Sequence, residues 1–483
     1  MKDKIPYLAV NKISKFAVAY IVFLLAIFYY STVAAYSDSF KEENIQFHSS
    51  NLVMNGTLLI PDGPGPHPTI ILIHGAGAHT REEYRAEAEI FANSGIAAFI
   101  YDKRTEGYSA TGIGEKSRSQ FLLAKDVLAA VNALKLRADI EPSQIGLWGL
   151  SEGGGVAPLA AAQTKDIAFV ISVSASGVPP IQQTSWAIEN QLRHKDIQAH
   201  SIIHSFTRNG MRFLLAAEFF AEATYNPIPP FEQVKQPILA IWGENDRTAP
   251  AFESYKIVKK ALELGGNEHY TIQFIPQANH DMRFSVDGFN EYEKFAPGYT
   301  ESMTTWIANV INGDIPKPQI IGQIPKQDRN SPTEIMELSW FDSAWLHLIY
   351  MIVLLILFSC YFGILFIKLL QKRKLYNKKT SINAYARILG VFGIVTTLGF
   401  FGYFGNTMIT NEYGPVIIGR PLPWLILQCM SFLIFLLTIL IAISFCKRRT
   451  TFIFNEKLRL ILLISGGVLF IPWAFYWQLL LPF

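Results

Sequence analysis

Cysteine is scarce in this sequence, and the long polar region of the chain has none. The three cysteines, Cys360, Cys429 and Cys446, all lie in apolar segments. A disulfide framework, a cysteine-based metal site and a catalytic thiol are therefore excluded from the polar region. The net charge of +3 over 483 residues is also small, so we expect no nucleic acid partner.

Charged residues are absent from the middle of five apolar runs. Each run has about 20 residues or more, which is enough to cross a bilayer. Transporters and proton relays usually need an ionisable group inside the membrane, so we expect these spans to anchor the protein or present lipid to it. The runs cover residues 16–36, then about 344–369, 386–408, 424–446 and 460–481.

Basic residues beside these runs predict their orientation. Four lysines precede the first run, Q-K-R-K-L-Y-N-K-K follows the second, and K-R-R follows the fourth, whereas the loop 410–423 is nearly free of them. Lysine and arginine favour the cytoplasmic side. We therefore expect residues 1–15 in the cytoplasm, a membrane anchor at 16–36, and the region 37–315 outside the membrane. The alternative for the first run is a cleaved signal peptide, since Val33-Ala34-Ala35 is a passable cleavage site.

The polar region 37–315 alternates short strand-like and helix-like stretches. Its strands, such as 69–74 and 144–149, are near-continuous runs of apolar residues. Such strands are typical of a parallel sheet that is covered by helices on both faces. We therefore predict an α/β fold, joined by a linker at 316–343 to an all-α transmembrane region of four helices at 344–483.

The stretch Ile145–Gly155 reads I-G-L-W-G-L-S-E-G-G-G, which predicts a strand, a sharp turn and a helix. Ser151 stands at the turn. A serine hydroxyl attacks a carbonyl only when it is exposed, close to a base and close to amide donors for the oxyanion. Gly149 and Gly153 provide the space that this connection needs. We predict that Ser151 is a nucleophile; the alternative is a plain glycine-rich loop before a helix.

The base and the acid are expected after later strands, with the acid first. Asp246 follows an apolar strand in W-G-E-N-D-R, and His280 follows the next one in P-Q-A-N-H-D-M. We predict that His280 takes the proton of Ser151 and that Asp246 fixes its tautomer. Glu244 is the alternative acid, and an aspartate that only binds its own turn is the alternative role for Asp246.

The glycine turn after the strand 69–74 can supply backbone donors for the oxyanion. We assign the amide of Ala76, with Gly77 as the alternative, and the amide of Glu152 as the second donor. His74, at the start of this turn, is expected to hold the loop rather than to act as a base.

The segment 177–235 is expected to form a cap over the pocket. It carries large apolar residues, among them Trp186, Phe206 and Phe213. Such residues can wall a substrate pocket and exclude water, although an extra layer of packed helices explains them as well. His200 and His204 have the spacing of a zinc pair, but no H-E-x-x-H pattern accompanies them, so we expect no metal.

These motifs resemble the α/β-hydrolase superfamily, in its dienelactone-hydrolase and serine-aminopeptidase-like groups. The resemblance covers about 44–313 and implies a Ser-His-Asp hydrolase of esters, thioesters or peptides without a cofactor. Thr105 stands where the family often has a glycine, which affects the loop near the site. The shared pieces are I-L-I-H-G-A-G at 71–77, Y-D-K-R at 101–104, G-L-S-E-G-G at 149–154, G-E-N-D at 243–246 and A-N-H-D-M at 278–282.

The sequence therefore predicts a membrane-anchored serine hydrolase whose catalytic domain faces outward. Its substrate is expected to be a small-molecule or lipid-like acyl ester or thioester, cleaved through an acyl-enzyme on Ser151. Two alternatives remain open. One is a peptidase or acyltransferase with the same three residues, and the other is a membrane sensor or binding protein with a hydrolase-like domain that does not catalyse.

Overall fold

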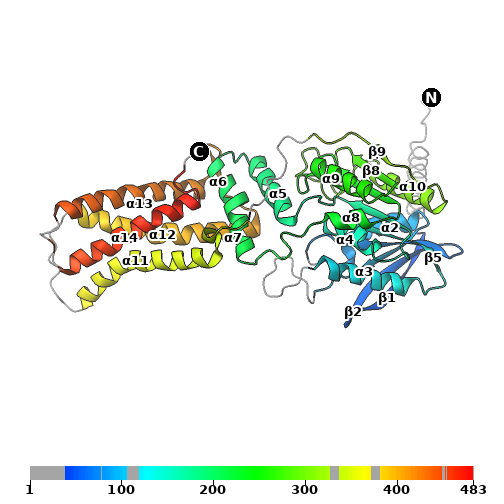
Figure 1. Ribbon diagram of the computed structural model, residues 1–483, viewed down its shortest axis with the longest axis horizontal. Coiled ribbons are helices and arrows are strands. Elements are labelled where there is room, and N and C mark those ends of the chain that lie inside the picture. The colour runs from blue at the N-terminus through cyan, green and yellow to red at the C-terminus, as the bar shows by residue number, and fades with distance from the viewer. Residues whose placement is uncertain are drawn as a thin grey trace, which may run out of the picture.

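A computed structural model describes residues 39–77, 79–105, 119–326, 337–370, 381–448, 452 and 454–481. These residues form a domain built on a β-sheet and a bundle of four long helices, with several short helices between them (Figure 1). The predicted anchor at 16–36 and most of the loop that begins at Thr105 lie outside the described residues.

The sheet has nine strands in the order β1-β2-β4-β3-β5-β6-β7-β8-β9. The first two strands form a hairpin, and β2 also pairs antiparallel with β4. All later neighbours are parallel, which confirms the predicted mostly parallel sheet. The strands are β1 Phe40–Ser49, β2 Leu52–Pro61, β3 His67–Ile73, β4 Ala97–Tyr101, β5 Ile140–Leu150, β6 Phe169–Val173, β7 Ile238–Gly243, β8 Tyr270–Ile275 and β9 Gln319–Ile321.

Helices cover both faces of the sheet, as the continuous apolar strands require. On β3, Ile70 and Leu72 face one core while Ile71 and Ile73 face the other, which is the period of two expected for a strand. The first face is covered by α2 Arg85–Asn93 and α10 Tyr299–Ile311, and the second by α3 Gln120–Leu134, α4 Glu152–Ala161, α8 Ile228–Gln233 and α9 Ala251–Leu264.

The expected cap is a set of helices inserted between β6 and β7. After α5, the chain runs without a break through α6, a π-helical turn and α7. Short π-helical turns of this kind occur mostly inside α-helices and often near functional sites. The cap helices are α5 Pro180–His194, α6 His200–His204, η2 Ser205–Gly210 and α7 Met211–Ala216.

The segment expected to be a linker contains two short elements. β9 adds a final strand to the sheet, and a short 3-10 helix, η3 Trp340–Asp342, precedes the bundle. Ser339 and Asp342 cap this turn reciprocally, which satisfies backbone donors at its start.

Four of the predicted apolar runs are long helices, each long and apolar enough to cross a membrane. A small hairpin of β10 Val416–Ile417 and β11 Arg420–Pro421 connects the second helix to the third. Glycine permits close helix packing here: a side chain on Gly467 would collide with Thr438. The helices are α11 Ala344–Leu370, α12 Ser381–Thr410, α13 Leu422–Lys447 and α14 Phe454–Tyr476.

The cap lies between the sheet domain and the bundle (Figure 1). Most of its buried apolar residues belong to the same apolar core as those of the four long helices; Trp186 of α5 is buried but is part of none of the three apolar cores. Phe206 packs against Phe404 and Trp424, and Phe213 against Trp477. These two phenylalanines, which the sequence suggested as pocket walls, therefore form the extra packing layer that was the alternative.

Candidate active site

Ser151 occupies a sharp connection between a strand and a helix. β5 ends at Leu150 and α4 begins at Glu152, so that Ser151 is the single residue between them. Its backbone has φ 56° and ψ −110°, a conformation that is costly for a residue with a side chain. The backbone amide of Ser151 donates to the carbonyl oxygen of Val173 at 2.8 Å, which holds the turn against the end of β6.

The glycines around Ser151 are required by their contacts. A side chain on Gly149 would collide with the backbone of Gly153, and one on Gly153 would collide with the carbonyl of Ile73. The turn therefore exists only because strand and helix can approach this closely, as the spacing of the glycines predicted.

His280 and Asp246 are joined by a hydrogen bond. The Nδ1 atom of His280 lies 2.8 Å from Oδ2 of Asp246. The other carboxylate oxygen, Oδ1, accepts from the amides of Thr248 at 2.8 Å and Ala249 at 2.7 Å. The Asp246 side chain is fully buried, and these bonds satisfy it. Of the two candidate acids, Asp246 and not Glu244 contacts the histidine in the described part of the chain.

The electrostatics of the histidine follow from this pairing. Burial on its own lowers the pKa of His280, but the charge of the adjacent Asp246 and the hydrogen bond to it outweigh that effect, so that the net pKa is raised. With Nδ1 facing the carboxylate, Nε2 is the ring atom left for proton exchange with a nucleophile.

The end of β6 connects the serine turn to the histidine loop. Val173 accepts the amide proton of Ser151, and the next residue, Ser174, donates its hydroxyl to the carbonyl oxygen of His280 at 2.7 Å. The two candidate residues are thus anchored on adjacent residues of one strand end. Among the described residues, no hydrogen bond joins Ser151 Oγ to the His280 ring; such bonds often tighten only when substrate is bound.

The expected oxyanion segments lie on both sides of Ser151. Glu152 is the first residue of α4, where backbone amides have no partner within the helix. The glycine turn after β3 comes close from the other side, because a Cβ placed on Gly75 would lie 3.7 Å from that of Ser151. Gly77 has φ +121°, a conformation that favours glycine. The turn containing Ala76 is therefore adjacent to the serine.

Sequence reasoning missed the residue that ties these two segments together. Lys103 donates to the carbonyl oxygen of Gly75 and to Oε2 of Glu152, the latter at 2.7 Å. Gln120 donates to the other oxygen of Glu152 at 3.1 Å. The Lys103 and Glu152 side chains are only 2% and 1% exposed. The motif Y-D-K-R contributes only to the resemblance; a lysine two residues after a buried strand is the signal in the sequence that could have found it.

His74 holds the glycine turn in place. Its Nε2 lies 2.5 Å from the carbonyl oxygen of Tyr101. Burial, opposed by this hydrogen bond, lowers the pKa of His74 to about 4, so that the ring is neutral near pH 7 and suits the structural role expected for it. The rings of His200 and His204 stack 5.5 Å apart, and the described residues contain no group of three or more metal-binding side chains.

The strand order, the helices on both faces and the turn at Ser151 define the class of the first domain. Residues 40–321 form an α/β-hydrolase domain, and four long apolar helices follow it. Within the domain, residues 129–286 match the family model described as BAAT / Acyl-CoA thioester hydrolase C terminal. This family model covers less than half of the 483 residues.

The relatives of this chain include an esterase and acyl-CoA thioesterases. The chain is 25% identical over 273 residues to Esterase EstD of Thermotoga maritima, covering 51% of this chain and 61% of that one. It is 24% identical over 280 residues to Acyl-coenzyme A thioesterase 1 of Rattus norvegicus, covering 56% and 60%. It thus spans less than two thirds of either relative. A dienelactone hydrolase from Anabaena variabilis matches with 19% identity and a TM-score of 0.37, covering 58% of this chain and all of that one.

Proposed function

We propose that this protein is a serine hydrolase that cleaves a carboxylic ester or thioester. The observation that carries the proposal is the strained turn at Ser151, anchored on the same strand end as His280, whose ring is bonded to the buried Asp246. The similarity to esterases and acyl-CoA thioesterases supports an acyl group as the part of the substrate that is transferred.

The proposed reaction has two steps. Ser151 Oγ attacks the carbonyl carbon while Nε2 of His280 takes the hydroxyl proton, and the buried Asp246 stabilises the imidazolium that forms. The amides of Ala76 and Glu152 bind the oxyanion. The imidazolium then gives its proton to the departing alcohol or thiol. In the second step water attacks the acyl-enzyme with the same base, which releases the acid and restores Ser151.

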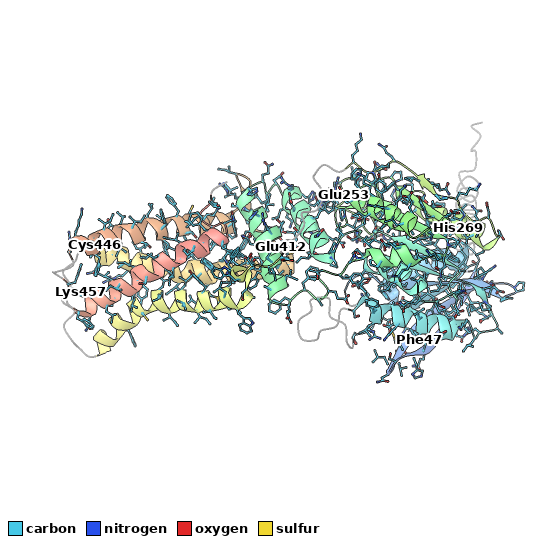
Figure 2. The ribbon with its side chains drawn as sticks, viewed as in Figure 1. Phe47, Glu253, His269, Glu412, Cys446 and Lys457 are labelled. Carbon is cyan, nitrogen blue, oxygen red and sulfur yellow. The ribbon has the colours of Figure 1, made fainter. Side chains whose placement is uncertain are left out.

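The proposed setting is a membrane, with about five spans when the run at 16–36 is included. The positions of the two ends of the bundle support an outward-facing catalytic domain. Cys446 and Lys457 lie at the far end of the bundle, whereas Glu412 lies beside the cap (Figure 2). The basic ends of the helices are thus opposite the hydrolase domain, and basic residues favour the cytoplasmic side.

Labelling with a fluorophosphonate tests both the chemistry and the orientation. Intact cells that express the full chain should be labelled, and Ser151→Ala should not be, although it should unfold at the same temperature as the original protein. Turnover of a soluble ester should fall by about 10⁴-fold or more in that variant. An active Ser151→Ala protein would refute the nucleophile, and labelling only after permeabilisation would refute the orientation.

A further inference from the structure

We propose that the substrate is an acyl ester whose hydrocarbon chain lies in the outer leaflet of the bilayer, and that it reaches Ser151 from the membrane side, past the cap. This inference rests on the proposed serine hydrolase and its membrane setting. It is carried by the position of the cap, which contacts the catalytic loops on one side and the outer end of the bundle on the other.

The cap lies on the catalytic edge of the sheet. The loops that carry Asp246 and His280 follow β7 and β8, and the chain enters the cap directly after β6, so that all three leave the same edge. Asn190 of α5 donates to the carbonyl oxygen of Arg247 at 3.0 Å, in the loop of the acid. His194, at the end of α5, stacks on Phe289 at 4.0 Å in the loop that follows His280.

The next residues of the chain contact the bundle. The amides of Gln198 and Ala199 donate to the carbonyl oxygen of Gly419, in the hairpin between α12 and α13, at 3.0 and 3.1 Å. The Lys195 ammonium donates to the carbonyl oxygen of Asn411, at the end of α12, at 3.2 Å. The residue that contacts the catalytic loop, His194, is thus followed at once by residues that contact the bundle.

Two further contacts, one to α13 and one to η3, make the connection between the cap and the bundle a fixed joint. Ser201 is buried and bonds to Gln428 of α13 at 3.1 Å. The Arg212 guanidinium lies 2.5 Å from the Asp342 carboxylate, whose side chain is 1% exposed. A buried ion pair is costly to break, because the remaining charge would have no partner. The cap is therefore the outermost layer of the bundle and not a mobile lid above it.

Exposed large apolar side chains, two of them tryptophans, mark where the membrane surface lies. Trp340 and Trp345 are 80% and 74% exposed, and they flank Asp342, which is bonded to the cap. Ile418, at the tip of the hairpin that holds Gly419, is 91% exposed. Tryptophan is enriched at the boundary between lipid and water. The boundary therefore lies at the level of the cap, between the bundle and the catalytic edge of the sheet.

A cleft opens at this same level. It has a volume of about 630 Å³ and lies between the segment after α5 and the hairpin, lined among others by Asp196, His200 and Arg420. Polar and charged side chains at a bilayer surface suit the head of an amphiphile whose chain remains in the lipid. A substrate held there would have to pass the cap to reach the catalytic edge, because none of the residues that line the cleft belongs to the catalytic loops.

The test compares delivery through the bilayer with delivery through water. The full chain is reconstituted into phosphatidylcholine vesicles, and fluorescein dipalmitate is placed either in those vesicles or in separate ones. We expect hydrolysis to be about tenfold faster or more when protein and ester share a vesicle, because the bilayer raises the local concentration of the ester. Fluorescein diacetate, which has the same leaving group but short acyl chains that let it exchange between vesicles through water, should be hydrolysed equally in both arrangements.

A single variant links this preference to the joint. Arg212→Gln leaves the Asp342 carboxylate buried without the guanidinium, which should loosen the contact between the cap and the bundle and reduce the preference for shared vesicles while hydrolysis of the diacetate continues. Arg137→Gln, which removes an ion pair with Glu43 and Asp139 on the hydrolase domain, is the matched control and should leave the preference unchanged. If Arg212→Gln fails to fold, the comparison of shared and separate vesicles on the original protein still decides.

The outcomes separate this inference from the proposed function. Equal hydrolysis of the dipalmitate in shared and separate vesicles would overturn delivery through the bilayer and leave the serine hydrolase intact. Hydrolysis of the diacetate alone would overturn a lipid chain as part of the substrate. If neither ester is hydrolysed and the fluorophosphonate labels nothing, the serine hydrolase itself is refuted.

Discussion

Lys103 Nζ lies 2.7 Å from Oε2 of Glu152, in a buried ion pair that joins two loops of the candidate oxyanion site. Glu152 directly follows Ser151, and Lys103 also donates to the carbonyl oxygen of Gly75, which precedes Ala76. One ammonium group thus fixes the distance between the two segments whose amides are proposed to bind the oxyanion. Lys103 is therefore a positioning residue in this site.

Replacing Lys103 should affect both stability and turnover. Lys103→Gln leaves the Glu152 carboxylate buried without its ion-pair partner, so the free energy of unfolding should fall by about 3–5 kcal/mol. Turnover of a soluble ester should fall by about 10²-fold with little change in KM, since donors out of position weaken transition-state binding more than substrate binding. Denaturant unfolding and steady-state kinetics measure the two effects.

A second change distinguishes positioning from stability alone. Lys103→Gln with Glu152→Gln removes both charges and should recover much of the lost stability, because no carboxylate is left unpaired. Turnover should stay low, because the bond to Gly75 is still weakened. If turnover recovers together with stability, the role of Lys103 is only structural.

Asp246 and Glu244 make a matched pair for identifying the acid. Asp246→Asn keeps the shape of the side chain but no longer holds the productive tautomer of His280, so turnover should fall by about 10⁴-fold. Among the described residues, the Glu244 carboxylate accepts from the amide of Gln277 alone, at 3.3 Å, and Glu244→Gln should change turnover by no more than a few-fold. Kinetics on a soluble ester decide between them, and the reverse order of effects would assign the acid to Glu244.

Activity and stability should respond to pH in opposite directions around His280. Its pKa is raised above the usual 6.5 by the adjacent Asp246, and only the neutral ring acts as a base, so the rate should rise with pH through a midpoint above 6.5. The protonated pair stabilises the fold below the unfolded-state pKa, and this contribution is lost as pH rises through the folded-state value.

Removing the acid should reveal the origin of this midpoint. In Asp246→Asn the main charge that raises the pKa of His280 is gone, while burial, which lowers this pKa, and the smaller effect of Asp281, which raises it, remain, so the midpoint of the residual activity should move to lower pH. Rate profiles of both proteins between pH 5 and pH 9 measure the shift. An unchanged midpoint would mean that a different group is being titrated.

The sequence sufficed for the parts of the site that depend on local pattern. The turn at Ser151 follows from glycines at fixed spacing, and the loops of Asp246 and His280 follow from the positions where apolar strands end. Parallel strands bring their carboxyl ends to one edge, so the predicted class of fold already places these loops together. The four apolar helices were equally readable, because length and hydropathy alone define them.

The missed features depend on partners far away in the chain. Lys103 and Glu152 are 49 residues apart, and nothing near either residue shows that they pair. The apolar residues of the cap, such as Phe206, showed that this segment is buried but not against what. Its partners Tyr403 and Trp424 come about 200 residues later, in helices read only as membrane spans. Hydrophobic patterns indicate burial; they do not identify the surface that provides it.

The glycines after Ser151 allow a last prediction with an internal control. Gly153→Ala places a methyl group against the carbonyls of Ile73 and His74, and because both belong to packed backbone, relief requires a shift of the strand or the helix. We expect the free energy of unfolding to fall by about 1–3 kcal/mol and turnover to fall with it, since the shift displaces Ser151. Gly155 lies in the same helix with nothing within 4 Å of the added carbon.

Gly155→Ala should therefore behave in the opposite way. Alanine is favoured over glycine in a helix by up to about 1 kcal/mol, so the variant should be slightly more stable and equally active. Thermal unfolding and ester turnover of the two variants, measured side by side, check the pair. If both variants have the same stability and the same turnover, the close approach of α4 to β3 does not hold Ser151 in its turn. Another contact would then have to maintain the strained backbone at Ser151.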